Sequence, residues 1–463
     1  MHPELSTASE ALAWLQANDI RRVELVFADL TSVARGKVLS HASFAETLGA
    51  KMPSLLLGLT VTGGEPKAVF DRIFPPTFPD MAMRPDWCTL VRDPLAAVPT
   101  ATILCDLEAS FTAADGHCQY QVAELSPRQL LKRVLARLQA AGYRARVAPE
   151  LEFFLVHPQR GADGGLQAAH GMSGSAAHIE SSHDLASAET ASTFAPLFDE
   201  LWAACEAQGI PITGYGHESA LGQYEVNFAP GEPLAQADAV FRFKRLAREV
   251  ARRHGCYATF MAKPYLHEPG TGLHWHISLA DEAGGNPFSA ADGAPDPRLR
   301  HFIGGWQASA RGAMAILAPY AHSYVRLQRP DASPASVEWG YDNRTAAFRV
   351  PHSDAANRRV EHRLPGGDAN PYLSLALMLG AGLAGMQQAI EPGPEVSDRP
   401  AQSARGALPL DLAEALAELQ RCPILGEALG APFIELYSLI KQHELTEQAA
   451  DADFAIKHLL ARS

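Results

Sequence analysis

Apolar and polar side chains alternate most regularly between residues 147 and 155, and this period predicts a β-strand. Leu151 and Phe153 fall on one face of the strand, whereas Glu150 and Glu152 fall on the other, because successive side chains point to opposite sides. Two carboxylates on one face are costly to bury unless a cation lies beside them. The strand therefore either exposes a polar face to solvent or contributes carboxylates to a cation site.

Two later stretches repeat the alternation and also gather polar side chains on a single face. These faces carry His274, His276 and Ser278 in one stretch, and Arg359, Glu361 and Arg363 in the other. Solvated charge pairs between neighbouring strands commonly explain a row like the second one. A His-x-His-x-Ser row opposite an apolar face is more specific and favours a binding site.

A fourth polar stretch, residues 217–228, carries Glu218 and Glu225. Their odd separation would place them on opposite faces of an unbroken strand. Gly222 lies between them and offers a break or bulge that returns both carboxylates to the same side. A surface strand pair is the alternative explanation. Taken together, the four stretches predict a curved sheet or half-barrel whose polar face lines a charged interior.

The rest of the pattern predicts a small N-terminal unit over residues 1–115 and a larger unit over residues 120–463. Strands are expected at residues 23–29, 36–39 and 101–107, and helices at residues 6–18, 127–141, 195–208, 234–254 and 411–459. Prolines argue against regular structure between residues 75 and 94. Residues 157–191 lack periodicity and are expected to form a long loop.

The composition is that of an ordinary globular protein, with 47% of the 463 residues hydrophobic and 20% charged. A net charge of −13 argues against binding to nucleic acid or to anionic membranes. The six cysteines form no CxxC pair, and the N-terminal segment has no signal-peptide core, so a cytoplasmic location is expected. The most apolar stretch, residues 373–386, is too short to span a bilayer.

The polar faces together supply five carboxylates and one imidazole, from Glu150, Glu152, Glu218, Glu225, Glu361 and His274. This donor set favours divalent ions that prefer oxygen, such as Mg²⁺ or Mn²⁺, over Zn²⁺. Six protein ligands suit two ions with open positions for phosphate and water. Arginines in the same stretches suit anionic substrates. Two metal ions and several arginines predict phosphoryl transfer from a nucleotide, without a P-loop, since no such motif is present.

Four separated motifs resemble those of the type I glutamine synthetase family. They are Pro149-Glu-Leu-Glu-Phe-Phe-Leu, Lys263-Pro-Tyr…Gly270-Thr-Gly-Leu-His-Trp-His-Ile-Ser, Asn343-Arg-Thr…Arg349-Val-Pro and Arg359-Val-Glu-His-Arg…Ala369-Asn-Pro-Tyr. The resemblance covers nearly the whole chain and is closest to the γ-glutamylpolyamine synthetase branch, typified by γ-glutamylputrescine synthetase. It implies an α+β fold, with an N-terminal β-grasp domain and a catalytic domain built on a curved antiparallel sheet or half-barrel with surrounding helices.

The resemblance also implies roles for individual residues. One metal ion would be held by Glu152, Glu218 and Glu225, and the other by Glu150, His274 and Glu361. Glutamate would be bound by Gly270, Arg326 and Arg363, and ATP by His276, Ser278, Arg344, Arg349 and Arg359. The γ-carboxylate of glutamate would attack ATP to give γ-glutamyl phosphate, with Arg344, Glu152 and Arg326 at the reacting groups, and an amine would then displace phosphate.

Two departures from the family pattern concern the acceptor. Glutamine synthetases carry an aspartate and a flap glutamate that bind and deprotonate ammonium. This chain has Thr60 or Leu59 at the first position and Ala332 at the second, with Asp331 able to substitute. These changes predict a primary amine, either a polyamine or a monoamine, as the acceptor. Candidate walls of its site are Trp339 and Tyr341, and candidate partners for a second ammonium group are Glu65, Asp71 and Glu338.

Three functions stay open on the sequence. They are a glutamate–amine ligase acting in amine catabolism or detoxification, an ammonia-using glutamine synthetase, and a non-catalytic relative. Intact ligands and arginines argue against the third, because clustered charges without a function cost stability. The family further implies a homo-oligomer of two stacked hexameric rings, in which the Thr60 loop completes the site of the neighbouring subunit.

Overall fold

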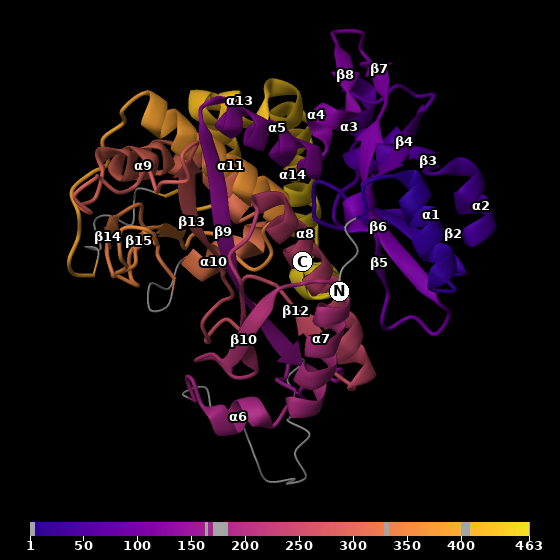
Figure 1. Ribbon diagram of the computed structural model, residues 1–463, viewed down its shortest axis with the longest axis horizontal. Helices are drawn as coiled ribbons and strands as arrows, with labels where there is room; N and C mark the ends of the chain where they lie inside the picture. The colour runs from indigo at the N-terminus through magenta and orange to yellow at the C-terminus, as the bar shows by residue number, and fades with distance from the viewer. Residues whose placement is uncertain (1–4, 163–164, 170–183, 328–332, 400–407, 463) are drawn as a thin grey trace.

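The computed structural model describes residues 5–162, 165–169, 184–327, 333–399 and 408–462. The fold is α+β, with a small N-terminal sheet domain beside a larger domain that is built on a curved sheet (Figure 1). No single helix in these ranges is long and apolar enough to cross a membrane, although α13 and α14 pass the length and composition test as a pair bent by 103°.

The N-terminal domain has a six-stranded mixed sheet in the order β2-β1-β6-β4-β3, with β5 beside β6. β1 and β6 run parallel, and the other pairs are antiparallel. The strands are β1 (Arg22–Ala28), β2 (Ala34–Ser40), β3 (Ala50–Pro53), β4 (Asp80–Pro85), β5 (Val91–Arg92) and β6 (Thr100–Glu108), followed by the hairpin of β7 (Ser110–Thr112) and β8 (Gln119–Gln121). The helices are α1 (Ala8–Ala17), α2 (His41–Thr47) and α3 (Lys67–Arg72).

The larger domain contains an eight-stranded sheet in the order β10-β11-β9-β13-β16-β15-β14, with β12 beside β9. All pairs are antiparallel except β14 and β15. The strands are β9 (Tyr143–Val156), β10 (Ile212–His217), β11 (Gln223–Phe228), β12 (Tyr257–Thr259), β13 (Leu273–Asp281), β14 (Trp339–Tyr341), β15 (Phe348–Val350) and β16 (Val360–His362).

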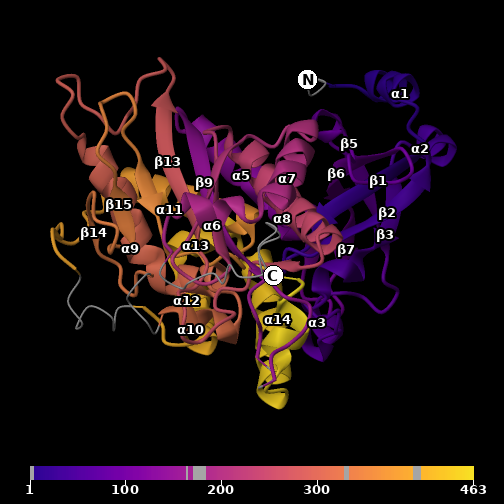
Figure 2. The same ribbon diagram turned by 90° about the horizontal axis from the view of Figure 1, so that it is seen from below.

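Helices cover the apolar face of this sheet and leave its polar face open. The helices are α4 (Val122–Leu125), α5 (Pro127–Ala140), α6 (Ala188–Ser192), α7 (Ala195–Ala207), α8 (Pro233–Arg253), α9 (Pro297–Leu317), α10 (Tyr324–Leu327), α11 (Pro371–Gln387), α12 (Leu412–Arg421), α13 (Pro423–Leu429) and α14 (Ala431–Ala450). Phe153 of β9 packs edge-on against Phe243 of α8. The indole N–H of Trp275 on β13 donates to Ser374 Oγ on α11 at 3.2 Å. Figure 2 shows α14 projecting from the rest of the molecule.

The strands and helices expected from periodicity are confirmed, although the helical stretch expected at residues 411–459 is divided into α12, α13 and α14, and the expectation for residues 75–94 is wrong. Residues 75–94 were expected to be irregular, yet β4 occupies Asp80–Pro85 and pairs with both β3 and β6. The prolines flank this strand rather than interrupt it, since Pro79 precedes it and Pro85 is its last residue. At the end of a strand, a missing N–H costs little pairing.

The predicted break at Gly222 is a complete reversal of the chain. Glu218 follows β10 and Glu225 lies on β11, so the two carboxylates belong to the two arms of a hairpin. Gly222 has φ +71°, and a Cβ there would lie 2.8 Å from the carbonyl oxygen of Leu155. The loop predicted at residues 157–191 ends earlier than expected, because α6 begins at Ala188 with Ser187 as its N-cap.

Candidate active site

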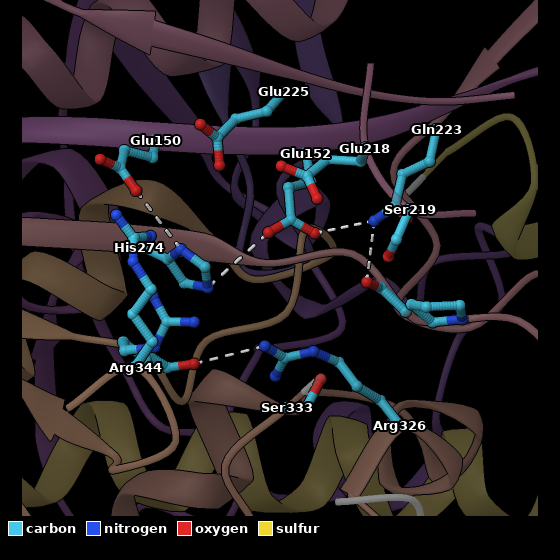
Figure 3. A pocket seen from close by; sticks show the side chains of 13 residues that line it. Glu150, Glu152, Glu218, Ser219, Gln223, Glu225, His274, Arg326, Ser333 and Arg344 are labelled. Carbon is cyan, nitrogen blue, oxygen red and sulfur yellow. Dashed lines mark hydrogen bonds and ion pairs between the residues drawn. The ribbon is translucent and has the colours of Figure 1, made fainter. Parts of the chain in front are cut away.

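The register of the large sheet places polar residues of neighbouring strands directly opposite one another. Glu225 of β11 lies opposite Glu152 of β9, and Glu150 of β9 lies opposite His274 of β13. Directly opposite residues have their side chains on the same face of a sheet. The alternation seen in the sequence therefore becomes one continuous polar row across three strands (Figure 3).

The row continues over the next two strands with alternating charge. His276 of β13 lies opposite Glu361 of β16, and Glu361 lies opposite Arg349 of β15. The Glu361 carboxylate is fully buried and accepts a hydrogen bond from Arg349 Nη1 at 3.0 Å and a second from Arg363 Nη1. Two guanidinium groups thus hold this carboxylate from both sides.

His274 lies at the centre of the row, where two groups of candidate metal ligands meet. Its Nδ1 is 3.6 Å from Glu150 and 3.8 Å from Glu361, and its Nε2 is 3.8 Å from Glu152. The ligand atoms of Glu150, His274 and Glu361 lie within 4.8 Å of one another, as do those of Glu152, Glu225 and His274. Nδ1 has no hydrogen-bond partner in the part of the chain that the structure describes, so it is available to a cation.

We call Glu150, His274 and Glu361 the β13-side cluster, and Glu152, Glu218 and Glu225 the β11-side cluster. Glu218 lines the same pocket but lies outside the 4.8 Å group that Glu152 and Glu225 form with His274. The donors are carboxylate oxygens and one imidazole nitrogen, which fit Mg²⁺ or Mn²⁺.

The two clusters differ in how their charge is compensated. In the β11-side cluster, burial and then the neighbouring glutamates raise the pKa of Glu152 to about 8, and burial and then Glu150 raise that of Glu225 to about 7. In the β13-side cluster, burial acts in the same direction, but Arg363 and His274 outweigh it and lower the pKa of Glu361 to about 2. Burial lowers the pKa of His274 to about 4, which keeps its ring neutral and able to bind a metal.

Two glycines allow the close approach that the site requires. A Cβ on Gly272 would lie 2.5 Å from His274 Nε2, and a Cβ on Gly270 would lie 2.3 Å from the carbonyl oxygen of Ala262 and 2.9 Å from Arg326 Cγ. The Gly272 N–H also donates to Glu152 at 3.0 Å. A side chain at Gly272 would therefore collide with the candidate ligand His274, and one at Gly270 would collide with Ala262 and Arg326.

Gln223 is a site residue that the sequence analysis missed. Its side-chain amide donates to Glu152 Oε2 at 2.9 Å and to the Gly270 carbonyl oxygen at 3.0 Å (Figure 3). The signal was present, because Gln223 precedes Glu225 by two positions on β11 and so shares its face. Ser219, Pro269 and Ser333 also line the pocket and were not anticipated.

The expected substrate arginines occupy different environments. Arg326 is buried and donates to the carbonyl oxygens of Leu364 at 2.8 Å and Arg363 at 3.3 Å, and burial lowers its pKa to about 10. Arg344 is exposed and lies on the pocket wall.

The residues expected near the nucleotide lie along β13 and beside it. Arg359 Nε donates to His276 Nδ1 at 3.4 Å, and His276 Nε2 lies 3.0 Å from Glu150. Ser278 lies farther along β13 and donates to the Arg146 carbonyl oxygen at 3.4 Å.

The acceptor-site candidates are not brought to this pocket. Among the described residues, its wall includes neither Thr60 nor Trp339. Thr60 is buried in a turn whose next residue, Val61, donates its N–H to Glu444 of α14 at 2.6 Å. Trp339 is 4% exposed, and its indole N–H donates to the Gly393 carbonyl oxygen at 2.7 Å. Asp331 and Ala332 lie outside the described residues.

Comparisons with known proteins agree with this geometry. Residues 124–455 match the family model described as "Glutamine synthetase, catalytic domain". The γ-glutamylputrescine synthetase PuuA of Escherichia coli strain K12 is 34% identical over 325 residues, which cover 70% of this chain and 68% of that protein. The glutamate–isopropylamine ligase of a Pseudomonas species is 29% identical over 442 residues, which cover 94% of this chain and 93% of that protein.

A solved structure extends the similarity to the whole fold. The ADP complex of GmaS superposes with a TM-score of 0.80 at 27% sequence identity, and the match covers 98% of this chain and 99% of that one. The similarity therefore includes the N-terminal domain, which lies outside the region matched by the family model.

Proposed function

The chain belongs to the glutamine synthetase family of ligases, and we propose that it joins the γ-carboxyl group of glutamate to a primary amine in an ATP-dependent reaction. The polar row across β11, β9, β13, β16 and β15 is the observation that carries the ligase chemistry. The amine acceptor is supported by the similarity to a γ-glutamylputrescine synthetase and to a glutamate–isopropylamine ligase.

The two clusters are proposed to hold two divalent cations, Mg²⁺ or Mn²⁺. Glu150, His274 and Glu361 would bind one ion, and Glu152, Glu218 and Glu225 the other. When bound, these ions neutralise charge on the transferring phosphoryl group. Gln223 and Gly272 hold the Glu152 carboxylate in place by donating to the same oxygen, which fixes the direction in which its second oxygen points.

The arginines are proposed to divide the anionic substrates between them. Arg326 and Arg363, with Gly270, would bind glutamate at the buried end of the pocket. The phosphates of ATP would contact Arg344, Arg349 and Arg359, with His276 and Ser278 toward the nucleotide. Arg349 is already held by Glu361 and Asp342, so its guanidinium is oriented before the substrate arrives.

The acceptor is proposed to be a primary amine because the position of the ammonium-binding aspartate of glutamine synthetases would be held here by Thr60 or Leu59, neither of which is charged. Thr60 is neutral, and its hydroxyl is 2.7 Å from that of Thr62 and accepts a hydrogen bond from the Gly64 N–H, so it does not supply a negative charge. Ammonium is held mainly by charge, whereas an alkyl amine gains about 0.8 kcal/mol for each methylene that it buries.

The decisive experiment compares acceptors at one pH with glutamate and ATP saturating. We expect a higher kcat/KM for at least one of putrescine, spermidine, ethanolamine, isopropylamine or phenethylamine than for ammonium chloride. The Glu361→Ala variant, purified in the same way, controls for contaminating host enzyme. Ammonium equal to or better than every amine would contradict the proposal and support the second candidate, ammonia-dependent glutamine synthesis, which the family model's description favours.

The active form is proposed to be two stacked hexameric rings in which the Thr60 loop serves the neighbouring subunit. The loop is absent from the pocket of its own chain. In addition, β2 is an edge strand, and Val38 on it is 55% exposed, which leaves a surface available for a neighbouring subunit. Light scattering should give a dodecamer. A monomer that is fully active at nanomolar concentration would contradict this assembly.

A further inference from the structure

Arg326 is supported by a turn that lies outside the active-site pocket. Arg326 extends from α10 into the pocket and is only 3% exposed (Figure 3). The turn comprises residues 366–369, between β16 and α11, and is closed by the Ala369 N–H, which donates to the Gly366 carbonyl oxygen at 3.0 Å. None of these four residues is among the described residues that line the pocket. The turn can therefore act on Arg326 without touching a substrate.

Asp368 connects this turn to the start of α10. The Ser323 hydroxyl donates to Asp368 Oδ2 at 2.6 Å, and Ser323 ends the 3₁₀ helix Ala321–Ser323 that leads directly into α10. Both residues are buried, with exposures of 2% for Ser323 and 4% for Asp368. A hydrogen bond between two buried side chains is costly to break, because neither partner can turn to water instead. This contact therefore fixes the base of the short helix that carries Arg326.

Lys244 of α8 holds the same turn through its backbone. The Lys244 ammonium group donates to the carbonyl oxygen of Gly367 and, at 3.4 Å, to that of Ala369. Lys244 is 3% exposed, and its Nζ lies 5.2 Å from the ring centroid of Phe260. Side-chain hydrogen bonds from α8 and from the 3₁₀ helix before α10 thus fix the turn in place.

The turn also contacts the glycine-containing segment that forms another part of the pocket wall. Gly366 pairs with Gly272 in an antiparallel bridge, and the Gly367 N–H donates to the Thr271 carbonyl oxygen at 3.3 Å. A Cβ on Gly367 would lie 2.6 Å from Thr271 Oγ1, so the approach is close. A displaced turn would therefore disturb Gly270 as well as Arg326, and both are proposed to bind glutamate.

Asp368 also compensates the charge of two buried cations. Burial lowers the pKa of Lys244 to about 7 and that of Arg326 to about 10. Asp368 opposes the shift of Lys244, and Glu152 and then Asp368 oppose the shift of Arg326. Burial raises the pKa of Asp368 itself, whereas its hydrogen bond from Ser323 and the two cations lower it. A buried cation is stable only when such a partner offsets its loss of hydration.

We propose that Asp368 is a positioning residue for glutamate recognition that acts through Arg326. It anchors the start of α10 through Ser323 and supplies negative charge near the guanidinium, so that Arg326 is oriented before glutamate arrives. The inference rests on the role of Arg326 in binding glutamate that is given under the proposed function. A neutral side chain of the same shape at position 368 should weaken the binding of glutamate and leave that of the nucleotide unchanged.

The test is calorimetric titration of the full-length protein with glutamate, in the presence of Mn²⁺ and a non-hydrolysable ATP analogue. Asp368→Asn keeps an oxygen that can accept the Ser323 hydroxyl but removes the charge, and we expect the Kd for glutamate to rise about tenfold. The Kd for the ATP analogue, titrated separately, should equal that of the wild type. Asp199→Asn, at an exposed position of α7, is the matched control and should bind both ligands normally.

Ser323→Ala is a milder variant that carries the test if Asp368→Asn fails to fold. It removes the hydroxyl that ties Asp368 to α10 but keeps the charge, so the Kd for glutamate should rise by a smaller factor than in Asp368→Asn. Ser192→Ala, at an exposed hydroxyl of α6, is its control. Equal weakening of glutamate and of the ATP analogue in either variant would indicate general damage to the fold and contradict a positioning role.

A double-mutant cycle shows whether Asp368 acts through Arg326. Arg326→Lys alone should raise the Kd for glutamate, and adding Asp368→Asn should raise it little further, because the interaction that Asp368 supports is already lost. Fully additive effects would mean that Asp368 acts independently and would overturn the proposal.

Two other outcomes separate this inference from the proposed function. Wild-type affinity for glutamate in Asp368→Asn, together with weakened binding in Arg326→Lys, would refute the positioning role alone. Absence of glutamate binding by the wild type, or an unchanged Kd in Arg326→Lys, would refute the glutamate site of the proposed function and this inference with it.

Discussion

The two carboxylate clusters line the same pocket, and His274 of the β13-side cluster lies 3.8 Å from Glu152 of the other, yet the two are in opposite electrostatic states. In the β13-side cluster, Arg349 and Arg363 hold Glu361, and its pKa is lowered to about 2. In the β11-side cluster, the pKa of Glu152 is raised to about 8, with burial as the largest cause and the neighbouring carboxylates next. Arginines of the protein thus neutralise the carboxylate of Glu361 in the β13-side cluster. In the β11-side cluster the carboxylates have no such partner among the described residues, and a cation would be needed to stabilise their charged forms.

Glutamates that share one polar face can therefore affect the stability of the protein in opposite directions. Removing Glu361 would leave two guanidinium groups without their common partner, whereas removing Glu225 would relieve repulsion. Loss of activity is expected from both changes, but the stability of the metal-free protein should change in opposite directions.

The largest effect is expected at Glu361. Glu361→Ala should abolish ligase activity, with kcat lowered by about 10³-fold or more, because a metal ligand that also orients two arginines is lost. Breaking the buried ion pairs should also lower the free energy of unfolding by about 3–5 kcal/mol. Chemical denaturation and steady-state kinetics measure the two effects.

Two companion variants keep the Glu361 prediction decisive. Glu361→Gln preserves the size of the side chain and should also be inactive, and Glu391→Ala, at an exposed ion pair with Arg300, should be neutral. Wild-type turnover of a folded Glu361 variant at saturating Mg²⁺ would show that the metal assignment is wrong.

Glu225→Gln tests the other cluster. Activity should fall strongly because a proposed metal ligand is lost, but the metal-free variant should be more stable than the metal-free wild type by roughly 1–3 kcal/mol at pH 8. The gain should vanish when Mg²⁺ is added, because only the wild type then gains the bound ion. If metal-free Glu225→Gln is less stable than the metal-free wild type, the β11-side cluster does not destabilise the fold, and the proposed electrostatic difference between the two clusters is wrong.

Gln223 is not a proposed metal ligand, but it donates a hydrogen bond to Glu152 of the β11-side cluster and so tests how that cluster is positioned. Gln223→Ala leaves all proposed ligands in place but removes the amide that donates to Glu152 and Gly270. We expect the apparent affinity for Mg²⁺ or Mn²⁺ to fall about 10- to 100-fold, with kcat largely recovered at saturating metal. Gln119→Ala, on the exposed hairpin strand β8, is the matched control. An unchanged metal dependence of Gln223→Ala would mean that Glu152 needs no orienting partner.

The smallest effect is a pH dependence of the metal-free protein. Above about pH 4.5, the unfolded chain releases the protons of Glu152 and Glu225, whereas the folded state keeps them until their pKa values of about 8 and 7. The stability due to these groups is therefore complete below about pH 4.5 and declines as pH rises toward 8. Thermal unfolding in EDTA should show this decline, and Mg²⁺ should reduce it. A Tm that rises from pH 5.5 to 8 in EDTA would contradict the raised pKa values.

Much of the site was predictable because strands convert sequence period directly into shared faces. Glu150, Glu152, His274 and Glu361 lie where alternation placed them, and the register then brought them together. Gln223 lies on the same face as Glu225 by the same alternation, but it was not predicted to be a site residue. An uncharged amide adds no charge to the polar face, so the sequence carried no separate signal for it. The pairing of Glu361 with Arg349 was not predictable, since it depends on a contact between β15 and β16 that no periodicity encodes.

Features that depend on tertiary context were harder to predict. The prolines around β4 are compatible with a strand because they fall at its ends, which composition alone does not reveal. The hairpin at Gly222 required knowledge of the +71° φ angle and of the approach to Leu155. Trp339 looked like a wall of the acceptor site from its place in the sequence, but it is buried against Gly393.

The central strand β9 also constrains the order in which this protein is made. It pairs with β11, β12 and β13, and the β13-side cluster is complete only when Glu361 on β16 joins Glu150, roughly two hundred residues away along the chain. A nascent chain on the ribosome therefore exposes Glu150 and Glu152 long before their partners exist. We therefore expect an ion to bind the β13-side cluster only after the sheet has assembled, and we expect a chain truncated before β16 to aggregate even when metal is added.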